Sequence, residues 1–337
     1  MSSKFFADDI NDLSTAAAAT RDDYIAKHFP GHLVSASSVK DALTMTGANF
    51  TVQKHPLICG PILLDGEQEH RMSHVPMQVG MVRMDTGEVI GTVGPNYGVV
   101  QTADAFQALE ILTEREDLQI RNVQIVNGGA RIRVTALLGV TEFLSITSQP
   151  NTICHFGIFE ATHDGTAKTT ATAYSVRLES LSGLTSRDMV NTYGLKHTSK
   201  VGERVERHSS QILKGLIGDA QAEAAMFSSM VNREMKLTEF ENFAHMILGG
   251  PIHEDDSQTK KTRRENQMEE LVGIYNEGNQ GAGSTAWGAY NTIASWLEIK
   301  REKYRGTDKE GNKFDSNLSG DGQSKLRKSL KLLTQED

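Results

Sequence analysis

The sequence predicts an α+β protein, in which an antiparallel sheet of β-hairpins with one inserted helix is followed by a helical C-terminal half. Three pairs of strand-like segments predict the sheet, because each pair flanks a glycine-containing turn, at residues 85–87, 127–129 and 163–166. Glycine readily adopts the positive φ that tight hairpin turns require. Beyond residue 195, apolar side chains recur every three or four residues instead, which is the spacing of helices with one buried face.

Length and composition bound the class of protein. The chain has 337 residues, a formal net charge of −8 and the apolar and charged fractions of an ordinary globular protein. No apolar run approaches the roughly 20 residues that span a bilayer, and Asp8 and Asp9 stand where a signal peptide is apolar. We therefore expect a cytoplasmic protein without membrane contact. Cys59 and Cys154 are too few for a disulfide scaffold, and Cys154 is expected to be buried on a strand.

Four regions are expected along the chain. Residues 1–50 form an N-terminal arm, partly helical, which is either a flexible leader or a segment that docks on a neighbouring copy. Ser38 is the predicted N-cap of a short helix in this arm. Residues 51–190 form the β-hairpin-rich core, and residues 191–305 form a helical region that packs on the core. Residues 306–337 form a polar tail, predicted to be flexible or to fold on a partner.

The first elements of the core are defined by prolines and caps. Residues 51–64 read as a strand that contains Pro56 and Pro61, and proline confines a strand to the edge of a sheet or splits it. Residues 65–74 are polar and predicted to form a loop. His70 and His74 in it resemble a metal-binding pair, but no third ligand is nearby, so we expect no metal or cofactor. The inserted helix is predicted to begin at Thr102, whose side chain can cap it.

Capping signals also divide the helical region. Thr238 with Glu241 forms a capping-box pattern that predicts the start of a helix. Gly249 and Gly250 predict its end. The charged residues 253–264 are interpreted as a solvated linker, followed by a short helix over residues 268–275 and a longer one over residues 285–303.

The candidate binding site is a basic helix over residues 196–214. Lys196, Lys200, Arg204 and His208 stand four residues apart, so they share one face of the helix. Such a stripe attracts a polyanion. The residues expected to hold phosphates are Lys196, Lys200, Arg204, Arg207 and Lys214, with Tyr174, Tyr193 or His197 stacking on bases. Arg131 and Arg133 share one face of a strand and form either a second cationic strip or an ordinary solvated face.

Three short motifs resemble a known family. They are NYGVVQ at residues 96–101, followed by Phe106; LKHT at residues 195–198; and STAWGAYN at residues 284–291. Their order and spacing, across residues 77 to 300, resemble the phage- and plasmid-borne family of unknown function numbered 932. The resemblance implies a mobile-element origin, and hence a bacterial host cell, and brings no established activity. The region before Thr51 departs from many members.

These observations favour a single-stranded nucleic-acid binding protein, in its sharper form a strand-annealing protein of a phage or plasmid. Its hairpin-rich architecture is similar to that of ring-forming annealing proteins of the RecT and Red-beta type, by analogy of fold class. Single-stranded DNA is the expected partner. A homo-oligomer, either a ring or a filament, is also expected, because the arm and exposed edge strands invite self-association.

Two other function classes stay open. A metal-dependent nuclease or hydrolase would use His155, Glu160, His163 and Asp164, which would have to converge on one point. The sequence contains none of the common hydrolase, zinc-protease or P-loop motifs, so we expect no catalytic residues. The third class is a structural or host-interaction protein that does not bind nucleic acid. Salt-dependent oligonucleotide binding would separate this class from the first.

Overall fold

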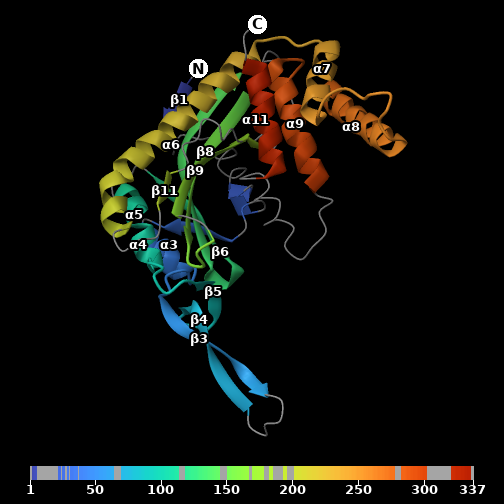
Figure 1. The fold of residues 1–337 in the computed structure, drawn as a ribbon. Helices are drawn as coiled ribbons and strands as arrows, with labels where there is room; N and C mark the ends of the chain where they lie inside the picture. The colour runs from blue at the N-terminus through green and yellow to red at the C-terminus, as the bar shows by residue number, and fades with distance from the viewer. Residues whose placement is uncertain are drawn as a thin grey trace.

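The computed structural model of the chain (Figure 1) describes residues 2–5, 22–23, 25–26, 29, 31–36, 38–63, 70–113, 118–144, 150–166, 169–177, 182–184, 193–195, 201–277, 282–301 and 320–334. Antiparallel sheets occupy the N-terminal half and helices the C-terminal half, so the predicted α+β class is confirmed. None of the helices within these ranges is long and apolar enough to cross a membrane.

The larger sheet is antiparallel throughout. Its strands follow the order β10-β9-β8-β7-β6-β2, with β1 also paired to β7 and β11 to β9. The strands are β1 (Ser2–Phe5), β2 (His32–Ala36), β6 (Gln119–Val126), β7 (Arg131–Leu144), β8 (Pro150–Thr162), β9 (Thr169–Arg177), β10 (Ser182–Leu184) and β11 (Tyr193–Leu195). β1 pairs with residues 139–142 of β7, beyond the part that β6 occupies, so the short strand extends an edge that the hairpin leaves open.

The smaller sheet has the order β3-β4-β5 and carries a projecting arm. Its strands are β3 (Val52–Leu63), β4 (His70–Arg83) and β5 (Val89–Val93). β5 pairs only with residues 79–82 of β4, and the outer parts of β3 and β4 extend away from the body as a two-stranded ribbon (Figure 1). β3 is an edge strand, as the prolines predict, and its register shifts after Pro56. The predicted loop over residues 65–74 is wrong for residues 70–74, which lie in β4.

The three predicted hairpins are confirmed. They are β4–β5, β6–β7 and β8–β9, and each is antiparallel. Gly87, Gly128 and Gly165 have φ values of 75°, 66° and 76°, in the left-handed region that glycine enters without strain. A three-residue 3₁₀ turn, Asn127–Gly129, joins β6 to β7.

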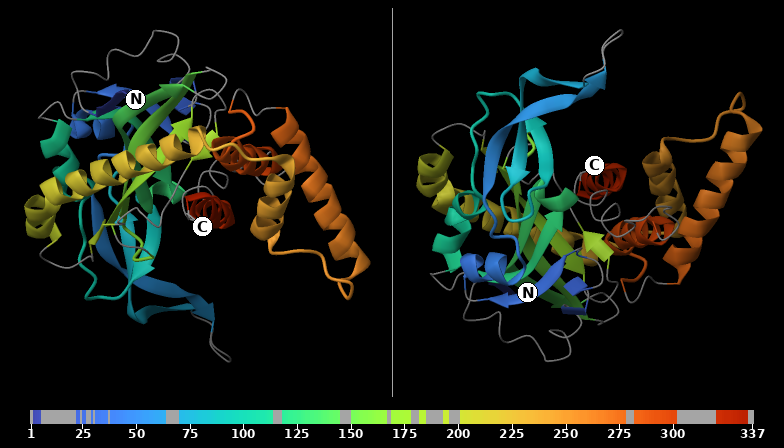
Figure 2. Two further views of the ribbon diagram at one scale, coloured as in Figure 1. Left: turned by 90° about the horizontal axis from the view of Figure 1, so that it is seen from above. Right: turned by 90° about the horizontal axis from the view of Figure 1, so that it is seen from below.

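The helices cover the larger sheet and form a cluster of their own. They are α3 (Val39–Met45), α4 (Thr102–Ala105), α5 (Gln107–Thr113), α6 (Val201–Val231), α7 (Leu237–Leu248), α8 (Gln258–Asn276), α9 (Ala286–Arg301) and α11 (Asp321–Thr334). The long α6 crosses one face of the sheet, and α7, α8, α9 and α11 gather at one end (Figure 2). The C-terminal end of α6 therefore links the sheet to the helical cluster.

Buried side chains form three clusters. One joins the smaller sheet, α3 and α5 to the larger sheet, through residues such as Phe50, Met81 and Phe106. A second fills the helical cluster around Phe227 and Trp287. A third lies where Ile25 and Phe29 meet β7, β8 and β9, and it includes Cys154, which is fully buried as expected.

The N-terminal arm belongs to the core of its own chain. β1 pairs with β7 and β2 pairs with β6, and Val39, Ala42 and Leu43 of α3 are buried. The expectation of a flexible leader, or of a segment docked on a neighbouring copy, is therefore wrong for these described residues. The predicted cap is confirmed, because Ser38 Oγ accepts a hydrogen bond from the Asp41 amide at 3.0 Å.

Two predicted caps lie elsewhere. Thr102 is the first residue of α4 rather than its N-cap, and its hydroxyl lies 3.1 Å from His163 Nε2 in the interior. α7 begins at Leu237, before the predicted cap Thr238. The carboxylate of Glu239 accepts a hydrogen bond from the Lys236 amide at 2.6 Å, so Glu239 rather than Glu241 occupies the capping-box position.

Two polar segments are helices. The predicted linker over residues 253–264 is wrong from Gln258 onward, because Ser257 caps α8 there, and its Oγ accepts a hydrogen bond from the Lys260 amide at 3.3 Å. The prediction of a flexible tail over residues 306–337 is wrong for α11. Leu326, Leu330 and Leu333 recur every three or four residues and are buried in the helical cluster. The helix is thus ordered by packing its leucines against the other helices of the same chain.

Candidate nucleic-acid interface

The structure describes only part of the predicted basic stripe. Lys196, His197 and Lys200 lie outside the described residues. Tyr193 falls in β11, and Arg204 and Arg207 fall in α6, but their side chains are also outside the described part. Lys214 is exposed on α6. The stripe as a whole therefore stays a prediction, and Lys214 is the member that the structure leaves open to solvent.

The two arginines of the predicted cationic strip on β7 form ion pairs with one acidic residue. Glu160 of β8 lies 2.5 Å from Arg133 Nε and 3.5 Å from Arg131 Nε. Arg133 also donates to Gln124 Oε1 at 3.3 Å and is only 3% exposed. The two arginines do share a face, as predicted, but Glu160 pairs with both of them, and Arg133 is not accessible to a strand. The interpretation of this pair as a phosphate-binding strip is therefore corrected.

The other predicted side chains do not converge. Tyr174 is buried, and its ring centre lies 5.6 Å from that of Phe29, so it cannot stack on a base. Asp164 Oδ1 accepts hydrogen bonds from the Thr166 amide and hydroxyl at 3.0 and 2.7 Å, which is a turn-forming role. In the described part of the chain, no three His, Cys, Asp or Glu side chains gather closely enough to hold a metal ion.

His155 belongs to a buried chain of hydrogen bonds between the sheet and α6. Its Nε2 lies 3.0 Å from Thr141 Oγ1, and its Nδ1 lies 2.8 Å from Ser175 Oγ. Ser175 donates its hydroxyl hydrogen to Glu223 Oε2 at 2.6 Å, so His155 Nδ1–H must donate to Ser175 and Thr141 must donate to Nε2. Burial lowers the pKa of His155 to about 3, which keeps the ring neutral. A serine hydrogen committed to a carboxylate differs from a nucleophile activated by histidine.

The motif at residues 284–291 forms the junction between the sheet and α9. Asn291 Oδ1 accepts a hydrogen bond from Arg177 Nη1 at 3.2 Å, and the guanidinium carbon lies 5.8 Å from the Trp287 ring centre. Thr285 Oγ1 accepts from the Gly288 amide at 3.0 Å and so caps the helix. Thr285, Trp287 and Asn291 are fully buried, so this motif holds the two halves together.

The motif at residues 96–101 joins the smaller sheet to the larger one. Gln101 makes two hydrogen bonds to the backbone of Val52, both at 2.9 Å, in place of a neighbouring strand. Tyr97 donates its hydroxyl to the Thr162 carbonyl at 3.4 Å. Burial, and then the nearby Asp164 carboxylate, raise the pKa of Tyr97 to about 12. This motif also has a structural role.

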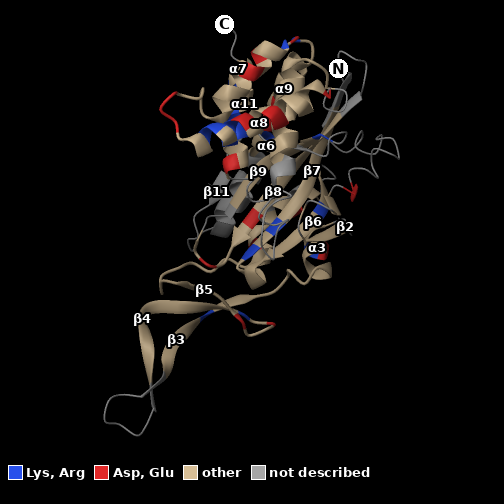
Figure 3. Ribbon diagram, turned by 90° about the vertical axis from the view of Figure 1, so that its right-hand side faces the viewer, with Lys and Arg blue, Asp and Glu red and all other residues tan. Residues whose placement is uncertain are grey.

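α8 extends beyond the helical cluster as a polar surface. Only Leu271 and Tyr275, near its C-terminal end, are fully buried. The first two turns carry Lys260, Lys261, Arg263 and Arg264 with no acid among residues 258–264. A helix that buries little of its surface exposes most of its side chains to solvent or to a partner. Figure 3 marks lysines and arginines on α8 in blue.

Four cations converge on a cavity between α8 and α11. Lys260, Arg263, Arg264 and Lys325 line this cavity of about 430 Å³, with Asp321 as its one carboxylate. Lys260 pairs with Asp256 and Lys325 pairs with Asp321, each across one helical turn. The hydrogen bond from Lys260 lowers the pKa of Asp256. The positive charge of each lysine is thus balanced by a neighbouring aspartate.

The two arginines of the cavity lack such acids. Among the described residues, neither Arg263 nor Arg264 makes an ion pair, and Arg264 Nη1 is shut off from solvent without a hydrogen-bond acceptor. Arg264 packs against the C-cap of α7, with its Nη2 2.8 Å from the place that a side chain at Gly249 would occupy. Burying a guanidinium nitrogen without an acceptor is unfavourable unless an anion supplies one.

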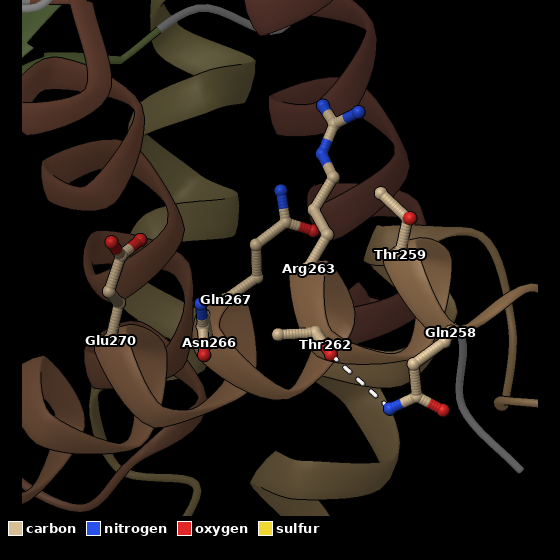
Figure 4. A pocket seen from close by; sticks show the side chains of 7 residues that line it. All are labelled: Gln258, Thr259, Thr262, Arg263, Asn266, Gln267 and Glu270. Carbon is tan, nitrogen blue, oxygen red and sulfur yellow. Dashed lines mark hydrogen bonds between the residues drawn. The ribbon is translucent and has the colours of Figure 1, made fainter.

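A shallow groove continues from this cavity along α8. It measures about 610 Å³ and shares Arg263 and Gln267 with the cavity. Its other side chains are hydroxyls and amides, with one acid, namely Gln258, Thr259, Thr262, Asn266 and Glu270. Figure 4 shows these side chains along the helix, with Gln258 donating to Thr262 at 3.5 Å. The arrangement offers a cationic end and a polar track that contains one carboxylate.

The sequence contains one signal for this surface, a run of basic residues, but the pattern alone predicts a linker there. Four basic residues within residues 260–264 read as a solvated linker. They line a cavity only because α11, some 60 residues further on, packs on α7 and α9 and brings Lys325 to the same place. No local spacing predicts that contact.

The fold and these contacts define an α+β protein whose curved hairpin sheet and C-terminal helical cluster are joined by a buried arginine–asparagine contact. The chain belongs to the family described as Domain of unknown function (DUF932), which matches residues 89–318. This confirms the family resemblance. No curated protein and no solved structure matches the chain.

Proposed function

We propose that the protein binds single-stranded nucleic acid through the basic surface formed by α8 and the start of α11. The observation that carries this proposal is the cavity into which Lys260, Arg263, Arg264 and Lys325 converge. A local cluster of cations attracts phosphates even on an acidic body, because screening limits electrostatic attraction to about 10 Å at moderate salt. The net charge of −8 therefore does not oppose binding at this site.

The groove along α8 favours a single strand over a duplex. Single strands combine phosphate contacts with contacts to exposed bases, which need side chains close to the backbone path. The hydroxyls and amides of Thr259, Thr262 and Asn266 stand beside the cationic cavity and can donate to and accept from base edges. In this proposal, a flexible nucleic-acid strand lies along the groove on α8.

Strand annealing is the sharper form of the proposal. It would use the α8 surface together with the predicted stripe on α6, of which Lys214 is exposed. The setting would be the cytoplasm of a bacterial cell that carries the phage or plasmid. An annealing protein must hold a strand with its bases accessible, and a shallow groove leaves them so.

The test is oligonucleotide binding measured by fluorescence anisotropy with the full chain. Four phosphate contacts predict that affinity falls about 50-fold between about 50 and about 200 mM salt. Lys260→Glu with Arg263→Glu should lower affinity at least tenfold, whereas Lys40→Glu, an exposed lysine on α3, should not. Binding that is independent of salt, or unchanged in the α8 double variant, would refute this surface. Lys200→Glu with Arg204→Glu tests the α6 stripe separately.

A second candidate function, self-assembly, is favoured by the β3–β4 arm. The arm exposes Ile58, Met72 and Met77 at 54%, 71% and 78%, and Met77 has a φ of 59°. A two-stranded ribbon with exposed apolar side chains is marginal by itself, and a second copy of the chain would cover it in a ring or filament. Sedimentation of wild type and of the double variant Ile58→Asp with Met72→Asp tests this. If the arm mediates assembly, the variant should sediment as a smaller oligomer or as a monomer.

A further inference from the structure

The cavity between α8 and α11 has an electrostatic feature that a chain of phosphodiesters does not satisfy well. Its two lysines are balanced by Asp256 and Asp321, which leaves the charges of Arg263 and Arg264 without partners among the described residues. The local excess is therefore two positive charges. An internal phosphodiester carries one negative charge, whereas a phosphate monoester carries close to two at neutral pH.

The guanidinium groups suit this ligand in geometry as well as charge. Arginine presents N–H groups in a planar fork, and two such forks bind the oxygens of one terminal phosphate in a bidentate manner. Arg264 Nη1 is closed off from solvent and has no acceptor in the described part of the chain. An oxygen of a ligand in the cavity would satisfy it once the guanidinium turns toward the cavity that Arg264 lines.

The apolar side of the cavity indicates what carries the phosphate. Leu248, Trp296 and Leu297 line it together with the cations. The indole nitrogen of Trp296 donates to Glu270 at 2.9 Å, which fixes the ring as a wall of the site. Carbon atoms of a sugar or a base fit against such a wall, whereas inorganic phosphate leaves it uncovered.

We infer that this cavity binds the phosphate monoester of a nucleotide, as the 5′-terminal phosphate of a nucleic-acid strand whose next residues lie in the α8 groove. The part of this inference that concerns the nucleic-acid strand rests on the proposed function. The part that concerns the phosphate monoester rests on the cavity alone. The cavity and groove meet at Arg263 and Gln267, so a strand anchored by its end would pass directly from one to the other. The same chemistry is present in a free mononucleotide.

The test compares two oligonucleotides of one sequence, labelled at the 3′ end, with a 5′-phosphate or a 5′-hydroxyl. Wild type should bind the phosphorylated strand about tenfold more tightly or better, as expected for charge-assisted hydrogen bonds. Arg264→Gln should remove this preference, so that the variant binds the 5′-phosphate and the 5′-hydroxyl strands with equal affinity, even though its affinity for both falls through the loss of one cation from the binding surface. Lys261→Gln, which removes a charge on the same helix outside the cavity, should keep the preference.

A second measurement distinguishes the sources of the phosphate and guards against misfolding of the variant. Thymidine 5′-monophosphate should raise the melting temperature of wild type and leave that of Arg264→Gln unchanged, whereas thymidine should raise neither. If the mononucleotide stabilises the protein but both oligonucleotides bind equally, the ligand is a free nucleotide and end recognition is overturned. If the mononucleotide has no effect and both oligonucleotides bind equally, the monoester site is overturned, while salt-dependent binding of both would leave the proposed function standing.

Discussion

Arg177 Nη1 donates a hydrogen bond to Asn291 Oδ1 at 3.2 Å and thereby connects β9 to α9 across 114 residues of sequence. Both side chains are fully buried, and the Trp287 ring lies beside the guanidinium. Asn291 Nδ2 in turn donates to the Trp287 carbonyl at 2.8 Å, which fixes the orientation of its amide. The tryptophan, the glycine and the asparagine of the family motif therefore serve one junction.

Asn291→Ala tests this junction. The substitution removes an acceptor from a buried guanidinium, so we expect the free energy of unfolding to fall by about 2–3 kcal/mol. Urea denaturation followed by circular dichroism measures it. Asn266→Ala on α8 is the matched control, because Asn266 is exposed and its loss should change stability by less than about 0.5 kcal/mol. Equal effects of the two substitutions would contradict a structural role for the motif.

Gly288 in the same motif allows a close backbone approach. A Cβ at this position would collide with the carbonyl oxygen of Gly283, a backbone atom that cannot swing away. Gly288→Ala should therefore cost about 3 kcal/mol or more. Gly273→Ala in α8 has open space around it and should instead stabilise the protein by about 0.5–1 kcal/mol, because alanine favours helix. Thermal unfolding of both variants checks the opposite signs.

Glu160 pairs with the buried Arg133 of β7. Glu160→Gln leaves the buried Arg133 without its carboxylate, so stability should fall by about 2–4 kcal/mol. The control is Asp85→Asn, which removes the acid from the exposed Arg83–Asp85 pair and should cost less than about 1 kcal/mol. Oligonucleotide affinity should be the same in Glu160→Gln and wild type at a temperature where both are folded. Tighter binding in the variant would restore the strip as a site.

The hairpins were predictable from the sequence because their signals are local. Glycines at positions 87, 128 and 165 stand where the backbone needs positive φ, and the flanking segments carry alternating or β-rich residues. The edge position of β3 followed from Pro56 for the same reason, since a missing amide hydrogen is a property of one residue. Local chemistry thus sufficed for the class and for much of the core.

The parts that were mispredicted depend on distant contacts. α11 is an isolated polar segment in sequence, and it folds because its leucines find the helical cluster. The fate of Arg131 and Arg133 was decided by Glu160 on the next strand, in a register that brings residue 133 directly opposite residue 160. The α8–α11 cavity combines both problems, because its cations come from two helices whose packing no periodicity specifies.

His155 provides a test of the buried network through pH. Its folded-state pKa is about 3, because burial disfavours the charged ring, whereas an unfolded chain has the ordinary value of about 6.5. Between these two values the unfolded chain binds a proton that the folded protein does not. Stability that is fully present above pH 6.5 is therefore lost as the pH falls, with a slope of up to about 1.4 kcal/mol per pH unit from this one group.

His155→Gln isolates that contribution, because glutamine can donate to Ser175 and accept from Thr141 but does not titrate. Other groups, including Glu223 at the end of the same chain, titrate in both proteins, so the difference between the two stability–pH curves reports the histidine. We expect urea midpoints measured from neutral pH down to about pH 4.5 to fall less steeply in the variant. Parallel curves would mean that His155 takes up a proton in the folded protein, and the direction assigned to the hydrogen bonds from Thr141 to Glu223 would then be wrong, since a protonated ring cannot accept from Thr141.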